Sequence, residues 1–162
     1  MRAEAYFITG CPNGQLAIMP RPRAGDWLED EIASWQQQGI NVVVSLLESE
    51  EIRELGLEEE QRFCEKLNLE FIQFPIPDRD IPASEEEVSN LVSQLVEHLR
   101  AGRGVGIHCR IGVGRSATLA VCVLAALSVP LDQAWSQVEQ SRGLSVPDTE
   151  EQREWVASWL TR

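Results

Sequence analysis

The chain has 162 residues, of which 43% are hydrophobic and 25% charged, and its formal net charge is −12. This length suits one domain with a normal core, so we expect a single domain over residues 1–162. No apolar run approaches the roughly 20 residues of a membrane span, and the acidic charge disfavours nucleic acid and anionic membranes as partners. The first residues lack a signal-peptide pattern, so we expect a cytoplasmic protein. We also expect it to be a monomer.

The cysteines do not suggest a metal site or a disulfide framework. Cys11, Cys64, Cys109 and Cys122 are widely spaced, and the chain has only two histidines. This pattern fits neither zinc-ligand spacing nor the cysteine density of a disulfide-bonded scaffold. We therefore predict no metal and no cofactor.

In chain order, the first predicted element is a β-hairpin. Two short apolar runs, Tyr6–Thr9 and Gln15–Met19, flank the turn signal GCPNG. A helix capped by Asp26 is expected to run to about Gln38. Gly39 then closes this helix.

The middle of the chain alternates strands and helices. The β-branched run Ile40–Leu47 predicts a strand that is buried on both faces. The acidic segment Glu48–Leu67 predicts two short helices broken near Gly56, and we expect its run Glu58–Glu60 to be solvated. Leu69–Phe74 alternates and predicts a strand, whereas the following PIPDRDIP is a loop because three prolines interrupt it.

The second half continues this alternation. Ser84 and Glu87 predict a capping box before an amphipathic helix that ends at Gly102. A strand over Gly104–Ile107, a helix over Ser116–Leu127 and two final helices follow. Together the elements predict a three-layer α/β fold, in which helices cover both faces of a mostly parallel sheet. Ligands of such sheets bind at the carboxyl ends of the strands.

The stretch GVGIHCRIGVGRSATLAVCVLAAL places reactive groups at a strand-to-helix turn. Five residues separate Cys109 from Arg115. A loop of this length can aim its backbone N–H groups at an anion, and the dipole of the following helix adds positive potential. Gly112 and Gly114 permit conformations that a Cβ would hinder. Arg115 offers a planar fork to phosphate oxygens, and the same field favours the nucleophilic thiolate of Cys109.

The motif HCRIGVGRS resembles the signature His-Cys-x5-Arg-Ser/Thr of the cysteine-based protein tyrosine phosphatases. FPIPDRDIPAS is similar to the acid loop of their dual-specificity branch, and SRGLSVPDTEEQREWV is similar to the C-terminal segment of the kinase-associated phosphatase group. The resemblance extends from about Ile40 to Trp159, with one departure at Ala117, where many relatives have glycine. It implies the family's sheet of five strands in the order 1-2-5-3-4.

The resemblance also implies an activity: metal-independent hydrolysis of phosphate monoesters through a cysteinyl-phosphate intermediate. Cys109 would be the nucleophile and Ser116 the hydroxyl that helps its thiolate leave, while His108 would support the loop and Gln152 would align water. The substrate would be a phosphorylated protein, with phosphotyrosine or mixed specificity. The phosphate would be bound by Arg110, Ile111, Gly112, Val113, Gly114 and Arg115.

Several alternatives remain open at this point. The general acid is Asp78 or Asp80, and the PIPD context favours Asp78. Ser116 could instead satisfy its own backbone, and Gln152 could be an exposed helix residue. Cys64 or Cys122 could form a disulfide with an oxidised Cys109. A phosphate-binding module without turnover and a sulfurtransferase of the rhodanese type are the alternative functions.

Overall fold

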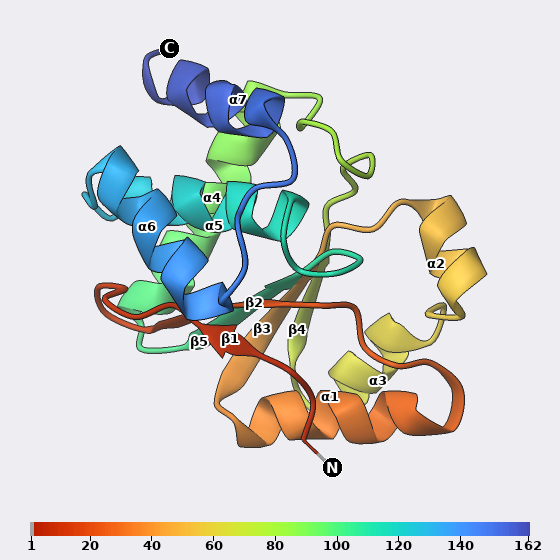
Figure 1. The fold of residues 1–162 in the computed structure, drawn as a ribbon. Helices are drawn as coiled ribbons and strands as arrows, with labels where there is room; N and C mark the ends of the chain where they lie inside the picture. The colour runs from red at the N-terminus through yellow and green to blue at the C-terminus, as the bar shows by residue number, and fades with distance from the viewer. Residues whose placement is uncertain (1) are drawn as a thin grey trace.

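The computed structural model describes residues 2–162, which form a central sheet with helices on both faces (Figure 1). The strands are β1 (Tyr6–Phe7), β2 (Gln15–Met19), β3 (Ile40–Ser45), β4 (Glu70–Gln73) and β5 (Gly104–His108). The helical elements are η1 (Gly25–Trp27), α1 (Leu28–Gln37), α2 (Ser49–Leu55), α3 (Glu60–Lys66), α4 (Glu85–Arg100), α5 (Arg115–Ala126), α6 (Leu131–Arg142) and α7 (Glu150–Leu160). The predicted three-layer α/β fold is confirmed.

The sheet has the strand order β1-β2-β5-β3-β4, as the resemblance implied. Only the β1–β2 hairpin is antiparallel; β2, β5, β3 and β4 pair in parallel. At one end of the sheet, His108 of β5 pairs with both Met19 of β2 and Ser45 of β3. The chain that follows β5 therefore leaves from the centre of the carboxyl edge of the sheet.

Alternating strand residues supply two separate cores because successive side chains point to opposite faces. Leu16, Ile18, Val44 and Ile107 are buried with residues of α4, α5, α6 and α7. On the other face, Ala17, Met19 and Val43 are buried with residues of α1 and α3. Figure 1 shows these two helical layers on opposite sides of the sheet. Within residues 2–162, every helix falls short of the length and apolarity that crossing a bilayer needs.

Two predicted helix caps differ from the structure. Asp26 does not cap α1, because the 3-10 turn η1 leads directly into the helix and no side chain bonds at its N-cap. Ser84 does cap α4, since its Oγ accepts from the Glu87 N–H at 3.1 Å. The return bond of a capping box is not formed within residues 2–162, and the exposed Glu87 carboxylate faces solvent instead.

We expect Leu95→Ala to lower the free energy of unfolding by about 2–5 kcal/mol, because it leaves a cavity between α4 and the sheet. The Leu95 side chain is fully buried in this core. Urea denaturation provides the measurement, and Ser93→Ala on the exposed side of α4 is the control. Equal midpoints for the two variants would contradict the assigned packing of α4.

Candidate active site

In the loop that joins β5 to α5, carbonyl groups accept hydrogen bonds from residues outside the loop. The Arg21 N–H donates to the Arg110 carbonyl at 3.1 Å, and Arg142 donates to the carbonyls of Ile111 at 2.9 Å and Gly112 at 3.0 Å. By contrast, no backbone N–H of residues 110–115 donates to a protein acceptor within residues 2–162. The loop therefore offers a run of unused donors to an anion, as its spacing predicted.

Gly112 has the backbone geometry that only glycine adopts without strain here. Its φ is +74°, and a Cβ would lie 2.6 Å from the carbonyl carbon and oxygen of Met19. At Gly114, a Cβ would lie 2.0 Å from Oδ2 of Asp148. The two glycines thus let the loop pack closely against the end of β2 and against the segment before α7.

Cys109 follows β5 directly and lies at the base of this loop with 2% of its surface exposed. Ser116, in the first turn of α5, is fully buried, and its Oγ has no hydrogen-bond partner among residues 2–162. The alternative in which Ser116 satisfies its own backbone is therefore not what the structure shows. A role beside the Cys109 thiolate stays a prediction.

Arg115 is 1% exposed, and Glu51 binds its guanidinium with both carboxylate oxygens. Nη1 lies 2.7 Å from Oε1 and Nη2 lies 3.0 Å from Oε2, while Nη1 also donates to the Ile76 carbonyl at 2.8 Å. Burial opposes the charge of Arg115, but hydrogen bonding to Glu51 and the charges of Cys109 and Asp78 outweigh it and raise the pKa. The Nη1–Nη2 edge is thus occupied by Glu51, and the second hydrogen of Nη2 is directed at Asp78 Oδ1. Nε is the guanidinium donor that forms no hydrogen bond within residues 2–162.

The carboxylate of Glu51 accepts hydrogen bonds from three residues. Besides Arg115, it accepts from the Glu48 N–H at 3.0 Å and from Arg110 Nε at 3.3 Å. Burial by itself would raise the pKa of Glu51, but these bonds outweigh it and lower the pKa. Because the folded-state pKa is lowered, the interaction stabilises the fold at neutral pH and is lost as the pH falls through the acidic range.

The two candidate acids occupy different positions. Asp78 Oδ1 lies 3.0 Å from Nη2 of Arg115, and its side chain is about half exposed. The carboxylate of Asp80 instead accepts from the Ile81 N–H at 2.7 Å, and the Asp80 N–H donates to the Pro77 carbonyl in a tight turn. Asp78 is the aspartate that the loop directs toward Arg115, and Asp80 stabilises the loop.

His108 is buried beneath the loop and bonded on both ring nitrogens. Nε2 lies 2.6 Å from Oε2 of Glu60, and Nδ1 lies 3.3 Å from the Cys109 carbonyl. Glu60 is only 2% exposed, so the expectation that the run Glu58–Glu60 is solvated was wrong at this position. The sequence could not show this, because the partner of Glu60 is 48 residues away in the chain.

Gln152 is fully buried, so the alternative of an exposed helix residue was wrong. Its Oε1 accepts from the N–H groups of Asp148 and Thr149 at the start of α7, and its Nε2 donates to the Asp80 carbonyl at 3.1 Å. In addition, Arg79 Nη1 lies 3.9 Å from Oδ1 of Asp148. Gln152 therefore joins α7 to the aspartate loop; its alignment of water stays a prediction.

Cys64 and Cys122, the two candidate redox partners of Cys109, are both buried. All four thiols are free, and Cys64 lies in the core on the opposite face of the sheet. Burial raises the pKa of both Cys64 and Cys122 well above the usual range of a thiol. Burial thus disfavours the thiolate form of both side chains, and a disulfide with an oxidised Cys109 stays a prediction.

Glu51 is the site residue that the sequence reasoning did not identify. It lies in the first turn of α2, where its bond to the Glu48 N–H completes a capping box. The acidic segment Glu48–Leu67 predicted two short helices, and its composition did not distinguish Glu51 from the other glutamates. The position of Glu51 in the chain could have indicated its role. α2 begins just after the carboxyl end of β3, and ligand-binding groups gather at that edge of the sheet.

Comparisons with known proteins agree with this geometry. Residues 17–127 match the family model described as "Polymorphic toxin system, DSP-PTPase phosphatase". The crystal structure of Tk-PTP in its active form is similar, with 30% sequence identity, a TM-score of 0.78 and coverage of 100% of this chain and 99% of that one. No curated protein matches the chain by sequence.

Two further solved structures share the fold at lower identity. Kinase-associated phosphatase (KAP), with its catalytic-site cysteine replaced by serine, aligns with a TM-score of 0.89 and 17% identity over 99% of this chain and 96% of that one. PTPMT1 in complex with PI(5)P aligns with a TM-score of 0.69 and 16% identity over 91% of this chain and 93% of that one.

The family match spans more than half of the chain, and the chain therefore belongs to the dual-specificity branch of the cysteine-based protein tyrosine phosphatases. It is accordingly a protein phosphatase. Neither a sulfurtransferase nor a phosphate-binding module without turnover is favoured by these relatives.

We expect Glu51→Gln to lower kcat/KM for p-nitrophenyl phosphate about 100-fold, because a displaced Arg115 no longer meets the phosphate. Vanadate should also inhibit this variant more weakly, which a purely structural defect distant from the loop would not cause. Glu50→Gln, on the exposed side of α2, is the control. Parent-like kinetics for Glu51→Gln would show that Arg115 needs no carboxylate to be positioned.

Proposed function

We propose that the chain hydrolyses phosphate monoesters of proteins without a metal, with Cys109 as the nucleophile. The observation that supports this most strongly is the run of N–H groups over residues 110–115 with no acceptor within residues 2–162, which directly follows the buried Cys109 and ends at the buried Arg115. Such donors match the equatorial oxygens of a phosphoryl group in transfer and need no reorganisation when charge develops there.

In the first step, the Cys109 thiolate attacks phosphorus. A P–S bond forms while the P–O bond to the leaving group breaks, and Asp78 gives its proton to the departing oxygen. The loop amides and the Nε donor of Arg115 bind the remaining oxygens. Asp78 is the candidate acid because its carboxyl reaches the site, where Oδ1 lies 3.0 Å from Nη2 of Arg115.

In the second step, water attacks the phosphocysteine. Asp78, now a carboxylate, takes a proton from the water, the P–S bond breaks, and inorganic phosphate leaves. The Ser116 hydroxyl, which has no hydrogen-bond partner within residues 2–162, is available to donate to the departing thiolate. Gln152 holds the aspartate loop through the Asp80 carbonyl, and we propose that it also orients the attacking water.

We further propose that the substrate is a soluble phosphoprotein with phosphotyrosine or mixed specificity, and that the chain acts as a monomer in the cytoplasm. The net charge of −12 supports a protein substrate over an anionic membrane surface. The four free thiols are consistent with a reducing compartment.

Cys109→Ser should abolish turnover while it preserves substrate binding, because the loop donors and Arg115 remain and a hydroxyl is a poor nucleophile at neutral pH. Steady-state hydrolysis of p-nitrophenyl phosphate and the affinity for a phosphotyrosine peptide are the two measurements. Hydrolysis near the parent rate would refute Cys109 as nucleophile.

Asp78→Asn should reduce hydrolysis of a phosphotyrosine peptide by about 10²–10⁴-fold, and of p-nitrophenyl phosphate less, because a basic leaving group needs the proton more. It should also remove the alkaline limb of the kcat–pH profile. Asp80→Asn is the matched control and should retain that limb. The opposite pattern would assign the acid to Asp80.

A further inference from the structure

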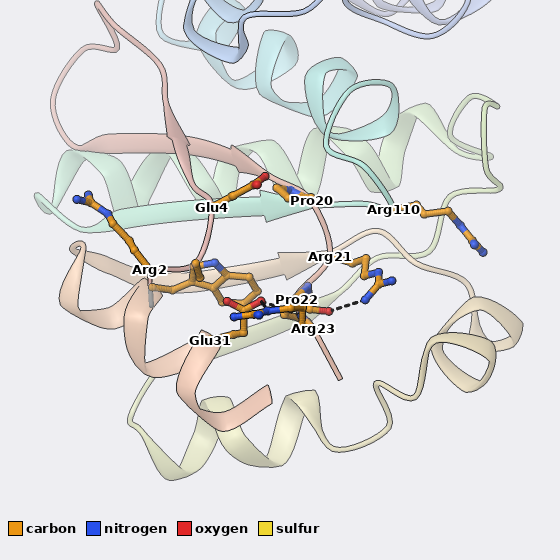
Figure 2. A pocket seen from close by; sticks show the side chains of 10 residues that line it. Arg2, Glu4, Pro20, Arg21, Pro22, Arg23, Glu31 and Arg110 are labelled. Carbon is orange, nitrogen blue, oxygen red and sulfur yellow. Dashed lines mark hydrogen bonds and ion pairs between the residues drawn. The ribbon is translucent and has the colours of Figure 1, made fainter. Parts of the chain in front are cut away.

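A hollow lined by arginines lies beside the Cys109 loop (Figure 2). Its volume is about 350 Å³, and four of the chain's thirteen arginines surround it. Two carboxylates, Glu4 and Glu31, also lie at its wall. The arginines are Arg2, Arg21, Arg23 and Arg110. In a chain of net charge −12, this is a local surplus of positive charge next to the site of phosphoryl transfer.

Arg21 and Arg110 belong to two segments that are in direct contact. The Arg21 N–H donates to the Arg110 carbonyl at 3.1 Å, and a Cβ on Gly112 would lie 2.8 Å from the Pro20 nitrogen. Prolines on both sides, Pro20 and Pro22, restrict the backbone of Arg21. Figure 2 shows both arginine side chains extending toward the same side of the loop. The Arg21 guanidinium is therefore presented beside the phosphate-binding loop by a stiff segment.

These arginines differ in whether they form ion pairs with carboxylates. Arg110 lies 3.3 Å from Glu51 and 3.6 Å from Glu54, and Arg23 lies 3.1 Å from Glu31. Arg21 instead donates to the Pro22 carbonyl at 3.2 Å and forms no ion pair with any carboxylate of residues 2–162. Of Arg21 and Arg110, Arg21 is thus the one whose charge is available to a ligand.

We propose that Arg21, with Arg110 beside it, binds an anionic group of the substrate peptide next to the phosphorylated residue. This inference rests on the proposed function and adds a substrate preference to it. The group is a carboxylate or a second phosphate, since the planar guanidinium binds both with paired hydrogen bonds. A residue one or two positions from the phosphorylated one lies within about 7 Å along an extended peptide, which matches a subsite on the adjoining segment.

Three phosphotyrosine peptides test this, identical except for alanine, glutamate or phosphoserine at the two positions flanking the phosphotyrosine. Affinities are measured with Cys109→Ser protein, and kcat/KM with the parent. We expect the two anionic peptides to be favoured about fivefold to tenfold over the alanine peptide, and the preference to weaken as salt is raised. The two anionic peptides together distinguish a carboxylate from a phosphate.

Arg21→Gln should bring the ratio of anionic to neutral peptide close to one in both measurements. The ratio is used because it cancels any general loss of activity. Arg100→Gln is the matched control: it removes an exposed arginine at the end of α4, away from the carboxyl edge of the sheet, and should keep the preference.

Equal affinities for the three peptides would overturn the subsite and leave the phosphatase activity standing. A preference that persists in Arg21→Gln would also overturn it. Faster hydrolysis of PI(5)P in phosphatidylcholine vesicles than of any peptide would assign the arginines to a lipid headgroup instead. If no phosphate ester is hydrolysed, the proposed function fails, while the affinities of the Cys109→Ser protein still decide the subsite.

Discussion

The buried ion pair between Arg115 and Glu51 is the interaction on which the rest of the site depends. A guanidinium that is 1% exposed would be very costly without a partner, and Glu51 supplies both charge and matching geometry. The same guanidinium reaches the carbonyls of Leu46 and Ile76, which follow β3 and β4. One side chain thereby joins α2, α5 and the ends of two strands, and it is oriented before any substrate arrives.

Around this ion pair, the loop between β5 and α5 uses its carbonyl groups and its N–H groups for different partners. Arg21 and Arg142 occupy carbonyls, and His108, held by Glu60, contacts the carbonyl of Cys109. The N–H groups of residues 110–115 are left for the ligand. This separation creates a local positive potential in a chain whose net charge is −12. Preorganised dipoles can achieve this because they act at short range, where the diffuse charge of the rest of the chain contributes little.

The sequence was most informative where the residues of the site lie close together in the chain. Cys109, the two glycines and Arg115 lie within seven residues, so the surrounding sequence predicted a strand, a loop and a helix, and the structure has all three. Anion binding by this loop stays a prediction. Prediction failed where a partner is distant in the chain. Glu51 binds a residue 64 positions away and Glu60 one 48 positions away, and nothing in their acidic surroundings distinguishes them from solvated neighbours.

The amino-acid sequence by itself determined the fold class and the position of the reactive loop, because hydrophobic periodicity and the Cys-to-Arg spacing are local properties. It also narrowed the acid to Asp78 or Asp80. Only the tertiary structure decided which aspartate faces Arg115 and which glutamates are buried. It also decided that Arg21 lies beside the loop with no carboxylate partner among residues 2–162. The physical reason is that burial and ion pairing depend on which segments the sheet brings together at its carboxyl edge, and residues far apart in the chain meet there.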